Sequence, residues 1–149
     1  MKNITENKKA KFDYYVIETF EAGIVLIGSE VKSCCNHNAS INNAYCFIDN
    51  DYQLKLIGSR IEPFKNAGYF SNYNPDRERS LLMHKKEIFN LKKAITEKGM
   101  TLIPLQLYFN DKGKIKLKLA LCKGKNTIDK RETIKKREND IELKRLIKK

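Results

Sequence analysis

The segment from Lys114 to Leu121 alternates strictly between large aliphatic residues and lysine or alanine. Successive side chains of a strand point to opposite faces, so the four aliphatic residues of this segment, Ile115, Leu117, Leu119 and Leu121, share one face. The alternation therefore predicts a half-buried strand with a lysine-lined outer face. Such a strand needs pairing partners, and the rest of the sequence supplies them.

Three pairs of apolar runs separated by turn residues predict β-hairpins. The first pairs Leu102–Phe109 with the alternating strand, joined by the turn residues Asn110-Asp111-Lys112-Gly113. The second pairs Tyr45–Ile48 with Gln53–Ile57, joined by Asp49-Asn50-Asp51. The third pairs Tyr14–Ile17 with Ile24–Ile27, on either side of Glu21-Ala22-Gly23.

Helical signals are few. His84 to Lys98 carries apolar residues at helical spacing, and Gly99 follows where a C-cap is expected. A shorter helix is expected to start at Ser29, whose hydroxyl can cap it, and Glu62 to Ser80 is expected to be a long loop. Six short strands, two or three short helices and no βαβ alternation predict a mainly β fold, a six-stranded barrel of the oligonucleotide-binding type.

The charge balance indicates the kind of partner. Thirty Lys and Arg against eighteen Asp and Glu give a net charge of +12, so a polyanion is expected. The longest apolar run, Ile24 to Ile27, is far shorter than the roughly 20 residues of a membrane span. We expect no membrane partner, no secretory signal and a cytoplasmic location, with Cys34, Cys35, Cys46 and Cys122 as reduced, buried, small apolar residues.

Composition divides the chain into three parts. Residues 1–11 form a basic segment, residues 12–124 the barrel, and residues 125–149 a basic tail. No aromatic residue occurs after Phe109, and Lys130 to Lys149 holds nine Lys or Arg and four Asp or Glu. Such a tail cannot bury a core of its own, so it is expected to be disordered when free.

Metal binding and catalysis have little support in the sequence. Cys34-Cys35-Asn36-His37 lacks the paired spacing of structural zinc sites. No phosphate-binding loop or nucleophile motif accompanies the histidines or carboxylates such as Asp13. We therefore expect no metal, cofactor, catalytic residue or small-molecule substrate. An acid/base pair of His84 and Glu30 that cleaves RNA is the enzymatic alternative.

Basic residues interleaved with aromatic ones favour RNA. Lysines would contact phosphates, and tyrosine or phenylalanine rings would stack on unpaired bases. The basic candidates outside the tail are Lys8, Lys9, Lys11, Lys114, Lys116 and Lys118, and the aromatic candidates are Tyr14, Tyr15, Phe70 and Tyr73.

Several blocks then resemble one bacterial family in the same order. They are Asn7-Lys8-Lys9-Ala10-Lys11-Phe12-Asp13-Tyr14, Glu18-Thr19-Phe20-Glu21-Ala22-Gly23-Ile24, Gly28-Ser29-Glu30-Val31-Lys32-Ser33, Leu81-Leu82-Met83-His84-Lys85-Lys86-Glu87-Ile88, Lys98-Gly99-Met100-Thr101-Leu102-Ile103-Pro104-Leu105 and Asp129-Lys130-Arg131-Glu132-Thr133-Ile134-Lys135-Lys136-Arg137-Glu138. The chain resembles the SsrA-binding protein family, also called small protein B.

The resemblance implies a non-enzymatic protein that binds transfer-messenger RNA and delivers it to ribosomes stalled on messages without a stop codon. It implies contacts with the small-subunit decoding region and a tail that becomes helical in the messenger channel. It implies RNA-contacting roles for Glu30, Leu82 and His84, and tail function for Asp129, Lys130 and Arg131. We further expect Lys32 to contact RNA, and Lys135, Lys136 and Arg137 to act in ribosome binding with the other tail residues.

Some positions depart from the family pattern. Phe12 replaces the usual histidine, Cys34-Cys35 replaces Leu-Arg, and Ser80 replaces a basic residue, so RNA affinity is expected to be slightly weaker or compensated elsewhere. The alternative binding function is that of a ribosomal protein or translation factor with the same type of barrel, which binds other structured RNA.

Overall fold

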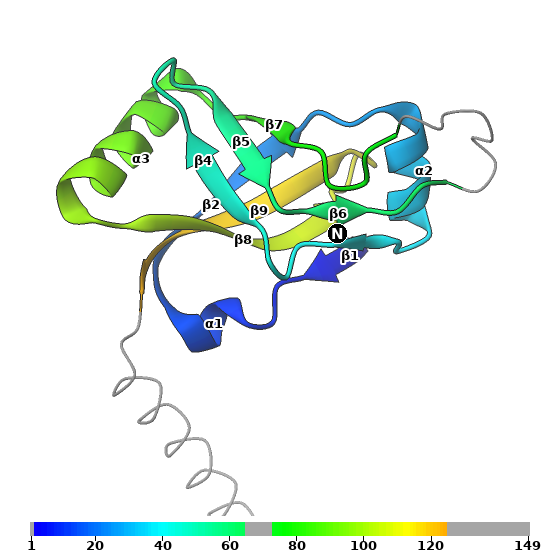
Figure 1. The fold of residues 1–149 in the computed structure, drawn as a ribbon, viewed down its shortest axis with the longest axis horizontal. Helices are drawn as coiled ribbons and strands as arrows, with labels where there is room; N and C mark the ends of the chain where they lie inside the picture. Colours follow the sequence, from blue (N-terminus) through cyan, green and yellow to red (C-terminus); the bar gives the residue numbers. More distant parts are fainter. Residues whose placement is uncertain (1, 65–72, 125–149) are drawn as a thin grey trace, which may run out of the picture.

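The computed structural model describes residues 2–64 and 73–124 (Figure 1). Its elements are, in chain order, β1 (Lys2–Glu6), α1 (Ala10–Asp13), β2 (Tyr14–Ile24), α2 (Gly28–Cys35), β3 (Ala39–Ser40), β4 (Tyr45–Ile48), β5 (Leu54–Ile57), β6 (Arg60–Ile61), β7 (Arg79–Leu82), α3 (Lys85–Lys98), β8 (Thr101–Phe109) and β9 (Ile115–Gly124). Within this part of the chain, no helix is both long and apolar enough to cross a membrane.

The strands close into a barrel. The main sheet has the order β1-β8-β4-β5-β7-β2-β9, and β8 also pairs with β9. Six strands therefore form a closed ring, as predicted. Strand β1 pairs with β8 but is not itself part of the ring. Strands β3 and β6 form a separate two-stranded ladder. The three helices lie at different places around the barrel, α2 at one end and α3 at the other (Figure 1).

Two of the three predicted hairpins are confirmed. Strands β4 and β5 pair from Tyr45↔Ile57 to Ile48↔Leu54, and β8 pairs with β9 along its length. Their turns are closed by side chains. Asp49 Oδ1 accepts hydrogen bonds from the backbone N–H groups of Asp51 and Gln53, both at 2.9 Å, and Asn110 Oδ1 does the same in the β8–β9 turn.

The hairpin predicted around Glu21-Ala22-Gly23 is wrong. Strand β2 runs through these residues without a turn and pairs with β9 as far as Gly23↔Lys116. Ala22 faces Leu117 and is 1% exposed, so the small residue fills a core position. The long partner strand supplies the hydrogen bonds that keep this stretch extended, which local turn propensity alone could not indicate.

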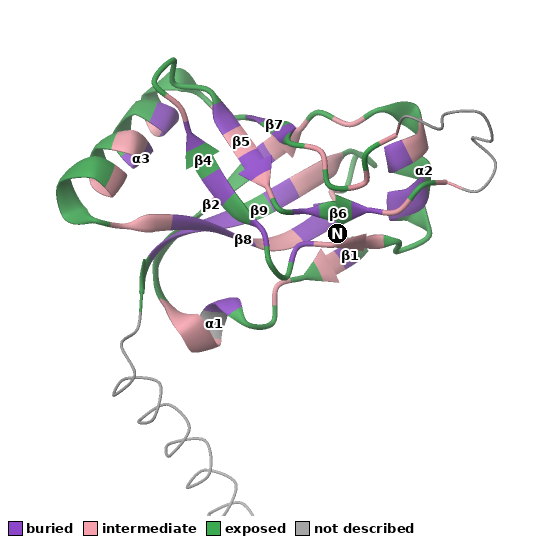
Figure 2. Cartoon of the chain, in the orientation of Figure 1, coloured by how far each residue is buried: buried purple, intermediate pink, exposed green. Residues whose placement is uncertain are grey.

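More residues of β9 are buried than its alternating pattern predicts. Leu117, Leu119 and Leu121 fill the barrel as expected, and Ala120 and Cys122 on the outer face of the strand are buried too. Figure 2 shows the buried, purple stretches along the strands of the barrel. Those two residues pack with Ile103 and with Ala10 of α1. The lysine-lined part of the outer face is therefore limited to the first half of β9. Helix α1 was not predicted, because a single alanine among lysines gives no amphipathic pattern.

The longer predicted helix is confirmed, and the start of the shorter one needs correction. Helix α3 buries Ile88 and Leu91 and ends at Gly99, which has a left-handed backbone. Helix α2 starts at Gly28. The group that caps it is the Glu30 carboxylate, whose Oε1 accepts a hydrogen bond of 3.0 Å from the Ile27 N–H, and Ser29 makes no such bond.

Gly58 offers a test of the barrel's close packing. Its φ is +81°, and an added Cβ would lie 2.9 Å from the Asn43 carbonyl oxygen. We expect Gly58→Ala to lower the free energy of unfolding by about 1–2 kcal/mol or more, from the left-handed backbone and the contact together. Gly28→Ala is the matched control, because nothing lies within 4 Å of its added Cβ. Urea unfolding of both variants measures the difference, and equal stabilities would contradict this account.

Candidate RNA-binding site

The outer face of β7, β2 and β9 combines exposed apolar and basic side chains. Gly23 of β2 is in register with Leu82 of β7 on one side and with Lys116 of β9 on the other. Residues opposite one another in antiparallel strands point to the same face. Two residues before Gly23 on β2, and so on the same face of the sheet, Glu21 is in register with Lys118. We call this set of five residues, Leu82, Gly23, Lys116, Glu21 and Lys118, the Leu82 face.

Leu82 is the most exposed large apolar side chain of the described residues. It is 61% exposed, although it lies within a strand. Gly23 leaves room for it, because a Cβ at Gly23 would lie 3.3 Å from Leu82 Cβ and 3.7 Å from Leu82 Cδ1. The leucine therefore lies next to bare backbone, and its exposed side chain shares a face with Lys116 and Lys118, which lie one strand further on. Such a surface can contact the sugar or base of an RNA strand whose phosphates the lysines bind.

Glu21 supplies an exposed carboxylate on the same face. Its Oε2 accepts a hydrogen bond from the hydroxyl of Tyr108, which reaches across β9 from β8. Burial, with the hydrogen bond to Glu21, raises the pKa of Tyr108 to about 12. The phenol therefore remains a donor at neutral pH. The remaining acceptor positions of Glu21 are open to a ribose 2′-hydroxyl or a base amino group.

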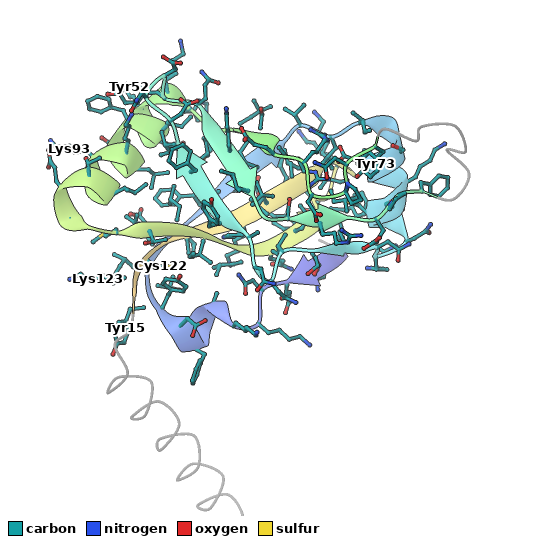
Figure 3. All side chains as sticks on the ribbon, viewed as in Figure 1. Tyr15, Tyr52, Tyr73, Lys93, Cys122 and Lys123 are labelled. Carbon is teal, nitrogen blue, oxygen red and sulfur yellow. The ribbon has the colours of Figure 1, made fainter. Side chains whose placement is uncertain are left out.

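Glu30, in contrast, lies in the interior. It is 1% exposed, and both carboxylate oxygens are occupied. Oε2 accepts hydrogen bonds from Arg79 Nη2 at 2.6 Å, Arg77 Nε at 3.0 Å and the Tyr73 hydroxyl at 3.1 Å. Oε1 accepts from Arg77 Nη2 as well as from the Ile27 N–H. Figure 3 shows Tyr73 beside α2. A direct RNA contact by Glu30 would require this cluster to open.

The charges of this cluster are arranged around a buried arginine. Arg79 is 0% exposed and donates to Ser59 Oγ at 3.0 Å and to the Pro75 carbonyl at 3.0 Å in addition to Glu30. Burial opposes ionisation of Glu30, but hydrogen bonds from Arg77, Ile27 and Arg79 outweigh it and hold the pKa of Glu30 below its ordinary value. The cluster joins the start of α2 to the segment that leads into β7.

The other predicted RNA contacts are spread over the barrel. Lys32 is exposed on α2, with its Nζ 5.5 Å from the centre of the Phe64 ring. Lys8 and Lys9 are exposed in the turn before α1, and Lys11 lies within that helix. Tyr14 is partly buried against the small cluster around Ala10, so its ring has a packing role. The structure does not bring the α1 and α2 candidates together (Figure 1).

His84 and Glu30 are not neighbours. His84 is the exposed N-cap residue of α3 and makes no side-chain capping bond, whereas Glu30 belongs to α2 at the other end of the barrel (Figure 1). The acid/base pair considered above is therefore not assembled. The Nδ1 atom of His37, the other histidine, lies 3.3 Å from the Ile4 carbonyl oxygen.

The cysteines are free in the described part of the chain. Cys34, Cys46 and Cys122 are buried as predicted, but Cys35 is exposed, which corrects that part of the prediction. Burial raises the pKa of Cys34 to about 12. Among the described residues, no group of three or more His, Cys, Asp and Glu side chains is placed to hold a metal ion.

Sequence reasoning missed several residues of these sites. The sequence predicts a turn at Glu21 and Gly23, and a loop that includes Arg77 and Arg79 and extends to Ser80. Strand β7 starts at Arg79 instead. Burial alternates along this strand, but with Arg79 buried and Leu82 exposed, so the polarity of Arg-Ser-Leu-Leu could not indicate it. Phe70 and the six tail residues, Asp129, Lys130, Arg131, Lys135, Lys136 and Arg137, lie outside the described residues.

Comparisons with known proteins agree over nearly the whole chain. A family model described as "SmpB protein" matches residues 4–149. The SsrA-binding protein of Symbiobacterium thermophilum is 51% identical over 144 residues, which cover 97% of this chain and 90% of that protein. The SsrA-binding protein of Fervidobacterium nodosum is 43% identical over 148 residues, 99% and 98% of the two chains.

A solved structure also matches. It is described as "tmRNA-SmpB: a journey to the center of the bacterial ribosome", and its chain superimposes with a TM-score of 0.67 at 38% identity, covering 87% of this chain and 93% of that one. The fold is thus shared with this structure, and the sequence is related to these proteins over nearly its whole length. The chain belongs to the SmpB family of SsrA-binding proteins.

Proposed function

We propose that this protein binds transfer-messenger RNA, the SsrA RNA, and delivers it to stalled ribosomes for trans-translation. The relatives are named for SsrA binding, and the matching solved structure is described by tmRNA, SmpB and the bacterial ribosome. The observation in this chain that carries the proposal is the Leu82 face, an exposed apolar side chain on the same face as two lysines of β9 in a protein of net charge +12. From this proposed action on ribosomes we infer a cytoplasmic location.

Each side chain of the Leu82 face has a role that its chemistry allows. Leu82 lies against a sugar or base, Lys116 and Lys118 bind phosphates, and Glu21 accepts hydrogen bonds from 2′-hydroxyl or amino groups. His84 extends this face at the start of α3. Glu30 acts through Arg77 and Arg79 as a positioning residue for α2 and its exposed Lys32. Lys8, Lys9 and Lys11 add phosphate contacts near α1.

The protein acts as an RNA-binding factor without a reaction of its own. The pair that could have cleaved RNA, Glu30 and His84, is separated, and the carboxylate of Glu30 is already neutralised by two arginines. General acid/base cleavage needs both groups within reach of one phosphodiester. Purified protein incubated with labelled RNA is therefore expected to leave it intact. Cleavage that is lost in His84→Ala would contradict this.

Competition among RNAs tests the binding proposal. We expect the full-length protein to bind transfer-messenger RNA at a lower concentration than transfer RNA or ribosomal RNA fragments. Leu82→Asp should weaken that binding by about tenfold or more, because it places a carboxylate beside RNA phosphates. Tyr45→Asp, at an exposed residue of strand β4 that belongs to no proposed contact, is the control of equal charge change. Equal binding of all three RNAs at physiological salt would favour the alternative, a ribosomal protein or translation factor.

A further inference from the structure

Helix α3 and the β4–β5 turn form a second exposed surface that the proposed function does not use. Phe89 is 54% exposed in the middle of α3, and Tyr52 of the turn is 45% exposed. Their rings are stacked, with centroids 5.8 Å apart and planes inclined by 23°. Figure 3 shows Tyr52 beside α3. Two exposed rings held against each other are unusual on a surface of charged residues.

The tyrosine is held in place by its turn. Tyr52 has a φ of +59°, which is strained for a bulky residue. Its N–H donates to the Asp49 carbonyl oxygen at 3.1 Å, and the same oxygen accepts a hydrogen bond of 2.7 Å from Lys92 Nζ. Lys92 Nζ also lies 4.5 Å from the centre of the Tyr52 ring. A ring fixed in this way loses little conformational entropy when a ligand contacts it.

Lysines surround Phe89 on the helix. Lys85, Lys86, Lys92 and Lys93 stand four and three residues before it and three and four residues after it, the spacings that place side chains next to one another on a helix. Lys85, Lys86 and Lys93 are exposed, and within the described residues none of the three has an ion-pair partner. Lys93 points away from the barrel (Figure 3).

We propose that this aromatic-lysine face binds unpaired nucleotides of an RNA, with a base stacked on the exposed ring of Phe89 and neighbouring phosphates on the lysines. Phosphate groups complement the lysines, and every base offers a flat surface to an aromatic ring. The proposal rests on the proposed function and extends it. Helix α3 starts three residues after Leu82, a span of about 10 Å, so an RNA bound at the Leu82 face is within reach of α3.

Salt titration of RNA binding tests the lysines. With full-length protein and transfer-messenger RNA, Lys86→Gln/Lys93→Gln should reduce the slope of log affinity against log salt by about 1.4, since each contact with a single strand contributes about 0.7. Lys2→Gln/Lys112→Gln removes two exposed lysines from other elements and is the matched control. Equal slopes for the two double variants would overturn the proposal, because the lysines of α3 would then act only through net charge.

A second pair of variants tests stacking. Phe89→Leu keeps an apolar side chain, and Phe89→Tyr keeps the ring. We expect Phe89→Leu to weaken binding of transfer-messenger RNA and of oligoadenylate by about fivefold or more. The same variant should bind a blunt RNA duplex as tightly as the wild type does, because a duplex offers no unpaired base. Phe89→Tyr should bind all three as the wild type does. Thermal unfolding of each variant separates a binding defect from a loss of folding.

The outcomes are distinct from those that test the proposed function. A wild-type protein without preference for transfer-messenger RNA would refute the proposed function. A preference that is preserved in Phe89→Leu and in the α3 lysine variant would overturn only the inference about α3. The inference is also overturned if these variants keep RNA affinity but lose association with ribosomes, which would assign the face to an acidic protein surface.

Discussion

Replacing Glu30 by glutamine is expected to lower the free energy of unfolding by about 3–5 kcal/mol, because it leaves Arg79 charged and buried without its carboxylate. Arg79 is 0% exposed, and its bond to Glu30 Oε2 is 2.6 Å long. Glutamine keeps the size of the side chain, but its amide cannot balance a guanidinium. The remaining acceptors of Arg79, carbonyl and hydroxyl oxygens, are uncharged.

An exposed ion pair supplies the control. Arg60 and Glu62 are joined by a bond of 2.6 Å, but their side chains are 48% and 47% exposed. Solvent screens such a pair, so Glu62→Gln should cost at most about 1 kcal/mol. Chemical unfolding of the wild type and the two variants at neutral pH makes the comparison. Similar losses for Glu30→Gln and Glu62→Gln would show that the buried cluster is not a main source of stability.

The pH dependence of stability gives a second measurement of the same cluster. The pKa of Glu30 is lower in the folded protein than its ordinary value of 4.5. The unfolded chain therefore binds the proton more readily, and the contribution of Glu30 to stability is present above that pH and lost as the pH falls below it. We expect the wild type to lose stability below about pH 4.5 more steeply than Glu30→Gln does. If the free energy of unfolding fell equally steeply with pH in the wild type and in Glu30→Gln, this account of Glu30 would be contradicted.

The sequence predicts the strands whose determinants are local and misses contacts made between distant residues. The β8–β9 and β4–β5 hairpins are predictable because alternation and a turn-forming Asn or Asp act within about ten residues. Gly23 has turn propensity, yet it lies with Ala22 in a strand because Leu117 and Lys116 pair with these residues from far along the chain. Tertiary pairing overrides local propensity there.

The same distinction applies to the site. The resemblance directs attention to Glu30, and a glutamate in the first turn of a helix is expected to be exposed and favoured by the helix dipole. Its arginine partners are 47 and 49 residues away, so its burial cannot be inferred from the helix sequence. Leu82 is predictable only through the resemblance, since an exposed leucine in a strand has no local signature. Only the register of β7, β2 and β9 places it on the same face as Lys116, with Gly23 between them.

The second large effect is expected in the tail. We propose that residues 125–149 act on the ribosome and that the barrel alone binds transfer-messenger RNA. Ile134, Ile141 and Leu146 recur among charged residues at intervals near two helical turns or less. A helix with so few apolar residues is marginal alone, because nucleation is costly. A messenger channel lined with RNA phosphates would neutralise the basic residues and stabilise it.

Truncation after Lys125 is therefore expected to leave the affinity of the barrel for transfer-messenger RNA within a few-fold of the wild type and to abolish tagging of stalled chains. Gel-shift titration and a tagging assay on stalled ribosomes measure the two effects separately. A full-length chain whose tail has the same composition in scrambled order is the matched control. It keeps the charge and loses the placement of Asp129, Lys130 and Arg131. Tagging by the scrambled chain would show that the tail acts through charge alone, and loss of RNA binding on truncation would refute the division between barrel and tail.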